Sequence, residues 1–166
     1  MKINRILVKT KSKTYPILVG DKLINNLPKI LKKNDLKFKK CLIVIDKNIP
    51  TKYLSLLKFK LRNKKTFIYK FNSSEKNKNF QNVNFLLKIL LKNNFSREDL
   101  LISVGGGIVG DISGFVSNIF KRGIKFVNIP STLLAQVDSS IGGKTGINNK
   151  YGKNLVGTFY QPNLVL

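Results

Sequence analysis

A glycine run between an apolar strand and a helical pattern constrains this chain more than any other feature. Residues 100–104 are an apolar run typical of a strand, residues 105–107 are glycines, and residues 108–120 have helical spacing of apolar side chains. Glycines let the backbone turn sharply and approach a ligand closely. A helix start presents unpaired N–H groups and the positive end of its dipole. The stretch 101–160, which begins with this unit, therefore predicts an anion site.

The spelling of the glycine run also matches a dinucleotide-binding pattern. Gly105, Gly107 and Gly110 satisfy GxGxxG, which is weak alone and gains weight from its place between a strand and a helix. A second glycine segment does not form a phosphate loop of the ATPase type. Gly143, Lys144 and Thr145 spell the end of such a loop, but its first glycine would have to replace Asp138. The sequence therefore favours a dinucleotide over a nucleoside triphosphate.

Length and composition favour one domain. The chain has 166 residues, and 42% of them are hydrophobic, which is enough to build a core. The single Cys41 excludes an internal disulfide. No apolar run approaches the ~20 residues of a membrane span, and the start does not look like a signal peptide. We therefore expect a cytoplasmic protein with no membrane partner.

The net charge of +23 raises the question of nucleic acid. Almost all basic residues are lysines scattered among Asn and Ile, which is typical of a compositional bias at the surface. The four arginines are Arg5, Arg62, Arg97 and Arg122. A nucleic-acid-binding module would require the lysines to gather on one face, so this reading stays an alternative and nucleic acid is not the expected partner.

Strand and helix patterns alternate along the chain. Strands are expected at 3–8, 15–19, 41–45, 66–71, 100–104, 125–129 and 164–166. Helices are expected at 21–32, 50–59, 80–91 and 108–120, and a further helix follows Ser131 or Thr132 as its cap. Asp21 is the expected N-cap of the first helix, which Pro28 kinks or interrupts. The pattern predicts an α/β fold, a Rossmann-like and largely parallel sheet with helices on both faces, preceded by an antiparallel hairpin.

Several polar residues are expected at one edge of this sheet. Asp46 ends the buried strand 41–45, and Glu75 and Lys78 lie in the polar loop that follows the strand 66–71. Open α/β sheets bind ligands at the carboxyl ends of their strands. Residues 138–157 are rich in glycine and polar side chains, and we expect a long functional loop there. The chain has no His and one Cys, so the sequence contains no metal site.

Three segments carry a family resemblance: GGGIVGD at 105–111, KRGIKFVNIPSTLLAQVDSSIGGKTGIN at 121–148, and GKNLVGTFYQP at 152–162. Together they resemble the 3-dehydroquinate synthases of the shikimate pathway. Asp46, Glu75, Lys78 and the run SREDLLISVGGG from Ser96 resemble the same family more loosely. The wider sugar-phosphate cyclases share much of this pattern, and the iron-dependent alcohol dehydrogenases share the architecture.

The resemblance implies a tightly bound NAD, a divalent metal that is usually zinc, and a sugar-acid phosphate substrate. The implied reaction converts 3-deoxy-arabino-heptulosonate 7-phosphate to 3-dehydroquinate and phosphate. It proceeds by transient oxidation, phosphate elimination, re-reduction, ring opening and aldol closure. A homodimer is implied as well.

The resemblance also assigns roles to residues. The residues implied to hold NAD are Asp46, Glu75, Lys78, Gly105, Gly106, Gly107, Ile108, Val109, Gly110, Asp111, Ser131, Thr132, Asp138, Lys144 and Lys153. The residues implied to act in catalysis or on the substrate are Lys144, Asn154, Asp138 and Arg122, the last of them across a subunit interface. For Lys144 and Lys153 the alternative is an ordinary solvated lysine. For Asp46, Asp138, Glu75 and Ser131 it is a cap or surface loop residue.

Members of the family continue past the position of Leu166 into a helical domain that supplies a glutamate and two histidines to the metal. We therefore expect residues 1–166 to form the NAD-binding domain, without the metal and substrate domain. Three readings remain: the amino-terminal half of an intact or split synthase, a non-catalytic remnant that binds a dinucleotide, and the basic nucleic-acid module. In the first reading a separate carboxyl-terminal half is a further partner, and an apolar interface is exposed without it.

Overall fold

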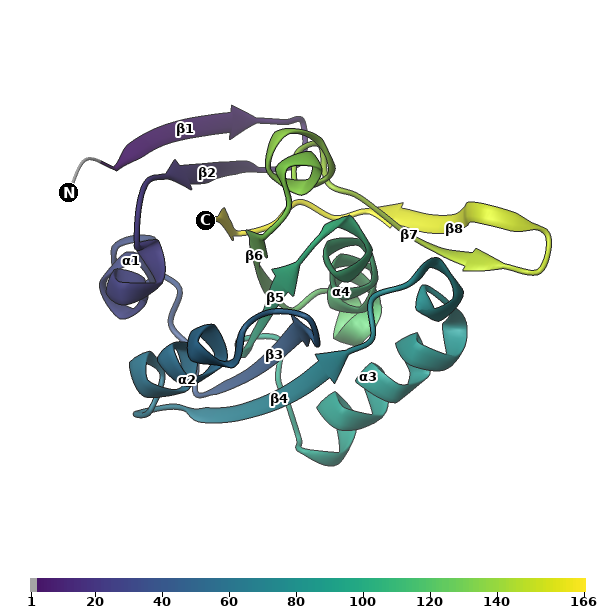
Figure 1. Cartoon of the computed structure of the whole chain (residues 1–166), viewed down its shortest axis with the longest axis horizontal. Coiled ribbons are helices and arrows are strands. Elements are labelled where there is room, and N and C mark those ends of the chain that lie inside the picture. The colour runs from purple at the N-terminus through teal and green to yellow at the C-terminus, as the bar shows by residue number, and fades with distance from the viewer. Residues whose placement is uncertain (1–2) are drawn as a thin grey trace.

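The computed structural model describes residues 3–166, which form a seven-stranded sheet, a two-stranded sheet and helices on both faces of the larger sheet (Figure 1). The strand order is β1-β2-β9-β6-β5-β3-β4, and in this sheet β1 and β2 pair antiparallel while the other pairs are parallel. The Rossmann-like fold and the amino-terminal hairpin are thus confirmed. No helix in the described part of the chain is long and apolar enough to cross a membrane.

The elements lie close to their expected positions. The strands are β1 Asn4–Lys9, β2 Thr14–Val19, β3 Lys40–Asp46, β4 Lys65–Phe71, β5 Leu100–Gly105, β6 Lys125–Pro130, β7 Lys144–Asn149, β8 Gly152–Phe159 and β9 Leu164–Val165. The α-helices are α1 Leu27–Lys33, α2 Thr51–Lys60, α3 Phe80–Lys92 and α4 Gly107–Ile119. Shorter helical turns are η1 Leu23–Asn26, η2 Glu75–Asn77, η3 Phe120–Arg122 and the π-helical η4 Ala135–Ser139.

Two apolar layers hold the central strands. On one face, alternate residues of β3 and β5 pack with buried leucines and isoleucine of α1 and α2. On the other face, the intervening residues, among them Leu42 and Leu101, pack with α3 and α4. Because both faces are covered, β5 is buried at every position, as its largely apolar sequence predicted.

The order of the strands creates one crevice. From β3 the chain first adds β4 on one side and then crosses to add β5 on the other. The two connections, through α2 and α3, therefore diverge at β3. In such a sheet the ligand crevice lies at the carboxyl ends of the two strands where the direction reverses. Here these are the ends of β3 and β5, at Asp46 and Gly105.

The expected loop at 138–157 is wrong, because most of it forms the β7–β8 hairpin (Figure 1). The hairpin packs on α4, where a Cβ on Gly114 would lie 2.5 Å from the Thr145 methyl carbon. Its strands approach closely because Gly146 pairs with Gly157. These contacts join residues that are distant in sequence. Of the hairpin's larger apolar side chains, only Ile147 is fully buried. The local composition therefore gave no strand signal.

The cap expected at the first helix is also wrong. Lys22, with φ of 52°, occupies the N-cap position of η1, and no side chain caps this turn. Pro28 follows the junction between η1 and α1, in agreement with the expected interruption, because proline has no N–H to continue a helical ladder. Pro50 is the N-cap of α2 rather than a residue of its first turn. At the later helix Thr132 does act as a cap, accepting a hydrogen bond from the Ala135 N–H at 3.3 Å.

Candidate functional site

The carboxyl edge of the parallel strands brings together residues that are distant in sequence. A Cβ on Gly105 would lie 3.3 Å from Cβ of Asp46, at the end of the neighbouring strand. The Ser131 N–H donates to the Gly105 carbonyl at 2.9 Å. A Cβ on Gly106 would lie 3.3 Å from a side-chain carbon of Thr132. The ends of β3, β5 and β6 therefore form one continuous surface.

The glycine turn is packed so tightly that its positions leave no room for a side chain. A Cβ on Gly105 would lie 2.7 Å from Val109, and one on Gly107 would lie 2.9 Å from Ser139 Oγ. A Cβ on Gly110 would lie 3.4 Å from Asn128 Nδ2. Val109 is buried and Ile108 is half-buried against the core beneath α4. These positions therefore offer a ligand mainly their backbone.

The start of α4 is suited to an anion. Gly106 is its N-cap, in an extended conformation, and no side chain in the described part of the chain caps the helix. The N–H groups of the first turn of a helix have no partners within it and carry partial positive charge. A phosphate here would meet backbone donors without a side chain in the way.

Asp46 keeps one carboxylate oxygen available. Its Oδ1 accepts the Asn48 N–H at 2.9 Å and so stabilises the turn after β3. No donor within residues 3–166 reaches the other oxygen. The side chain is half-buried beside Gly105. Asp46 therefore acts as a turn cap and still has an acceptor for a hydroxyl group.

Lys78 is a buried cation that joins three elements. Its ammonium donates to Asp111 Oδ2 on α4 and to Asn154 Oδ1 on β8, both at 2.5 Å. The exposed fractions are 4% for the Lys78 side chain and 22% for that of Asp111. Burial raises the pKa of Asp111, and the neighbouring Lys78 ammonium opposes this rise. Lys78 therefore connects β8 to the first half of α4 through these two side chains.

Glu75 and Lys153 lie at the rim of the same cluster. Glu75 accepts a hydrogen bond from Asn148 Nδ2 at 2.7 Å, and the Lys153 ammonium lies 4.0 Å from it. Both charged side chains are largely exposed. A hollow of about 650 Å³ opens here between the loop after β4 and the turn of the hairpin. Sequence reasoning missed Asn148, because a polar residue in a glycine-rich segment has no distinctive spacing.

Asp138 and Lys144 lie on the segment that leads from β6 into the hairpin. Both side chains are exposed, and no interaction partner is found for either among the described residues. Lys144 borders a small hollow with Gly110 and Ser139. It therefore lies near the start of α4, with its ammonium free to meet an anion.

Arg122 is not part of this arrangement. It follows α4 and precedes β6, so it lies at the amino edge of the sheet, opposite the glycine turn. Arg122 lines a hollow there together with Lys13 and Arg97. Burial lowers the pKa of Lys13 to about 8. Within one chain Arg122 cannot reach the carboxyl edge, and a role in the site would require a second subunit.

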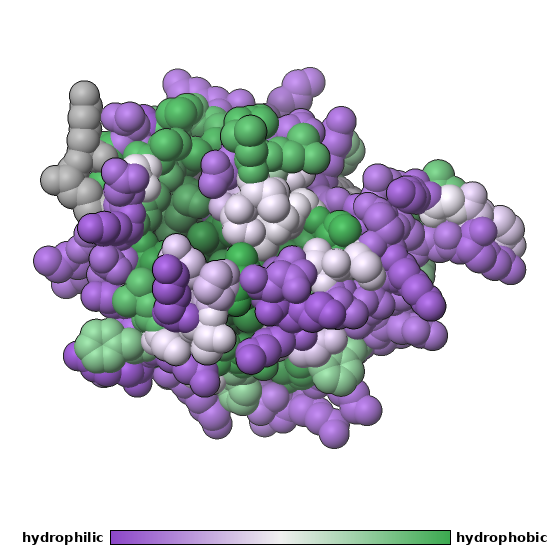
Figure 2. Space-filling model, in the orientation of Figure 1, coloured by the Kyte–Doolittle hydropathy of each residue, from purple (hydrophilic) through white to green (hydrophobic). Residues whose placement is uncertain are grey.

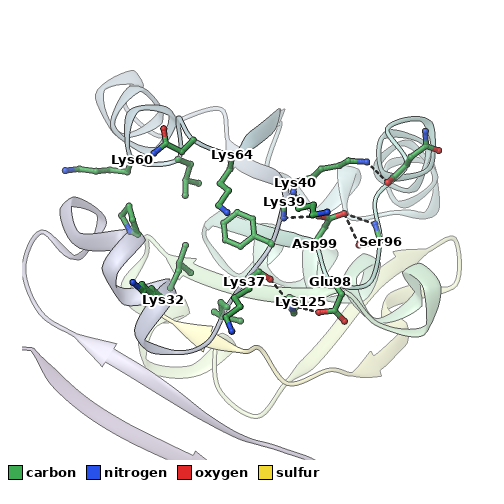
Figure 3. A pocket seen from close by; sticks show the side chains of 17 residues that line it. Lys32, Lys37, Lys39, Lys40, Lys60, Lys64, Ser96, Glu98, Asp99 and Lys125 are labelled. Atoms are coloured by element: carbon green, nitrogen blue, oxygen red, sulfur yellow. Dashed lines mark hydrogen bonds and ion pairs between the residues drawn. The ribbon is translucent and has the colours of Figure 1, made fainter.

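A hollow of about 940 Å³ lies at the amino edge as well (Figure 3). Figure 3 shows Lys60 and Lys64 on one side and Lys32 and Lys37 on the other. Asp99 in its wall accepts four hydrogen bonds from the chain itself. Lys32 and Lys60 lie in the last turns of α1 and α2, where they complement negative helix ends. Lys32 and Lys60 thus have a structural explanation, and the hollow is separate from the glycine turn.

The described residues do not fit a metal ion. No group of three or more His, Cys, Asp and Glu side chains within residues 3–166 could hold one. Cys41 is fully buried in β3, and burial raises its pKa. No step of a reaction is therefore assigned to a metal bound by this segment.

Comparisons with known proteins agree with the fold. The family described as 3-dehydroquinate synthase N-terminal matches residues 68–166. A 3-dehydroquinate synthase from Pelagibacter ubique (strain HTCC1062) is 54% identical over the whole chain, which covers 45% of that relative. The chain thus spans less than half the length of these curated relatives.

Solved structures share the same architecture. A 2-deoxy-scyllo-inosose synthase, crystallised with carbaglucose-6-phosphate, NAD+ and Co2+, is 23% identical with a TM-score of 0.89, over 98% of this chain and 44% of that one. The 2-epi-5-epi-valiolone synthase of Streptomyces hygroscopicus subsp. jinggangensis 5008, with NAD+ and Zn2+ bound, is 26% identical with a TM-score of 0.81. That match covers 96% of this chain and 44% of the other.

Proposed function

This chain belongs to the 3-dehydroquinate synthase family, and from that premise we propose that residues 1–166 are the NAD-binding domain of such an enzyme. The observation that carries the proposal is the meeting of Asp46, the glycine turn and Thr132 at one edge of the sheet. The uncapped start of α4 lies in the same place. The whole protein would convert 3-deoxy-arabino-heptulosonate 7-phosphate to 3-dehydroquinate and phosphate.

Each part of the edge has a role in holding the dinucleotide. The amides at Gly106, Gly107 and Ile108 would donate to the pyrophosphate, and Gly110 and Asp111 would continue this wall. The free oxygen of Asp46 would accept ribose hydroxyls. Ser131 and Thr132 would line the opposite side. NAD, when bound, would supply reversible hydride transfer, so that the reaction has no net oxidation.

The segment from η4 through β8 would face the substrate. Lys144 lies near the start of α4 and has no partner for its ammonium among residues 3–166. It would bind a phosphate or carboxylate as a point charge. Asp138 would orient the nicotinamide end or a substrate hydroxyl. Lys153, close to Glu75 at the rim, would face the cofactor, and Asn154 would face the substrate.

Partners would complete the active site. The metal ligands would come from a helical segment beyond the described residues or from a separate carboxyl-terminal half. An exposed apolar row suits such docking: Leu133, Leu134, Val137 and Ile141. Figure 2 shows apolar surface gathered where Figure 1 places β1, β2 and the segment after β6. In a homodimer Arg122 would serve the partner's site, and a cytoplasmic location fits the single free cysteine.

A non-catalytic remnant is the second candidate, and one observation disfavours it. The polar segment 138–154 is intact, and Asp138 and Lys144 are exposed and without a partner among the described residues. A remnant without a substrate has no need of such side chains.

A chimera tests the proposed reaction. Residues 1–166 would replace the matching part of the Pelagibacter ubique relative, which is 54% identical. We expect NAD-dependent phosphate release from the heptulosonate phosphate, with Lys144→Ala reducing it by about 100-fold or more. A folded chimera without activity, beside an active relative, would contradict the proposal.

A further inference from the structure

Asn148 is the central contact between the hairpin and the loop after β4. Its backbone N–H donates to the Lys78 carbonyl at 2.7 Å. Its side-chain Nδ2 donates to the Glu75 carbonyl oxygen at 3.0 Å and to Glu75 Oε2 at 2.7 Å. Its Oδ1 accepts the Asn154 N–H at 3.0 Å. One side chain thus connects two residues that the proposed site uses.

The chemistry at this position requires an amide. An amide carries a donor and an acceptor on one planar group, and Asn148 uses the donor on a carboxylate and the acceptor on a backbone N–H. A carboxylate here would keep the acceptor but would repel Glu75. Asn154 has a φ of 58°, in the left-handed region that Asn tolerates better than most residues. The bond from its N–H helps to hold it there.

The position of Asn154 determines the next contact in turn. Its Oδ1 accepts from the Lys78 ammonium, which also pairs with Asp111. Asn148 therefore sits between the exposed Glu75 and the buried Lys78 pair. A shift of the hairpin would disturb both ends of this chain of contacts together.

We propose that Asn148 is a positioning residue that clasps the hairpin to the loop after β4 and thereby sets Glu75 for the dinucleotide and Asn154 for the substrate. The part concerning the dinucleotide rests on the proposed function. The clasp itself rests only on the four hydrogen bonds. Asn148 need not touch the ligand.

The neighbouring Asn149 provides a matched control. Its Oδ1 accepts the Tyr151 N–H at 2.8 Å within the hairpin turn, and it makes no side-chain bond to the β4 loop among the described residues. Asn149→Ala therefore removes an amide of the same size from the same strand without opening the clasp. The variants to compare with it are Asn148→Ala and Asn148→Asp.

The first measurement is amide hydrogen exchange of the unliganded full chain. We expect Asn148→Ala to reduce protection of the Asn154 amide about tenfold, because one hydrogen bond is lost. Asn149→Ala should leave it unchanged. Unchanged protection in Asn148→Ala would overturn the clasp, whatever the ligand.

The second measurement is NAD affinity. We expect a loss of about tenfold in Asn148→Ala and a larger loss in Asn148→Asp, with Asn149→Ala like the wild type. In a Glu75→Gln background, Asn148→Asp should add a smaller loss than it does beside Glu75, since the repulsion between the two carboxylates is gone and only the donor to the residue 75 carbonyl is still missing. If exchange changes while NAD affinity stays within about twofold, the clasp is merely structural and the positioning role is wrong. If the wild type binds no NAD, the proposed function and the positioning role both fall, and the exchange result still decides the clasp.

Discussion

Gly157→Ala is expected to open the β7–β8 hairpin while leaving the seven-stranded sheet folded. A Cβ at this position would overlap the Thr145 carbonyl oxygen and would lie 3.1 Å from the Gly146 Cα. Both obstacles are backbone atoms of the paired strand, so no side-chain rotation relieves them. We expect a loss of about 2 kcal/mol or more in the stability of the hairpin. Amide exchange should become fast in β7 and β8 and stay slow in β3 and β5.

Gly146→Ala is the matched control, because it places the same methyl group on the opposite strand of the same pair. There the nearest atom is the Val156 carbonyl oxygen at 3.2 Å, which a shift of a few tenths of an ångström accommodates. Its effect should be clearly smaller. Equal exchange in the two variants would mean that the close pairing of glycines does not hold the hairpin.

Lys78→Met is expected to lower the free energy of unfolding by about 3 kcal/mol at pH 7, because it leaves the Asp111 carboxylate largely buried without its cation. Denaturant unfolding measures this loss. Lys76→Met is the control, since Lys76 is exposed on the same loop and carries the same charge. It should change stability by no more than about 0.5 kcal/mol.

The loss in Lys78→Met should depend on pH. Burial already raises the pKa of Asp111 above 3.8, so the folded state holds this proton more tightly than the unfolded state. The contribution of such a carboxyl to stability falls as pH rises above its unfolded pKa and through its folded pKa. Removing the cation raises the folded pKa further, so the deficit should be smaller near pH 4 than at pH 7. An equal deficit at both pH values would contradict this account of the pair.

Much of the sheet was predictable because its signals are local. The buried strand β3 is a continuous apolar run, β5 and β6 are apolar except for Ser103 and Asn128, and the glycines that follow Val104 mark the turn into α4. The positions of Asp46 and of the glycine turn follow from these elements and from the rule that ligands bind at carboxyl strand ends. The meeting of Lys78 with Asp111 did not follow, because it depends on how the loop after β4 folds back over α4.

The hairpin was not predictable from its composition. Its register depends on the pairing of Gly146 with Gly157 and on close packing against Gly114 of α4. Glycine lowers the local preference for a strand, and it is explained here only by the backbone of the paired strand, which approaches it closely. Asn148 was missed for the same reason. Its role is visible only when Glu75 and Asn154, separated widely in sequence, are seen at its two ends.

The central claim is that the carboxyl edge of this sheet binds NAD, and calorimetric titration of the purified chain tests it most directly. The titration should be run at about 0.05 M and about 0.5 M salt, because screening separates binding at a site from general attraction to a highly basic protein. We predict saturable binding of one NAD per chain at both salt concentrations. Gly107→Val should abolish this binding while the circular dichroism spectrum stays unchanged. The valine side chain would lie at the start of α4, where it would crowd Ser139 of η4. Binding that disappears at high salt, or that persists in Gly107→Val, would contradict the claim.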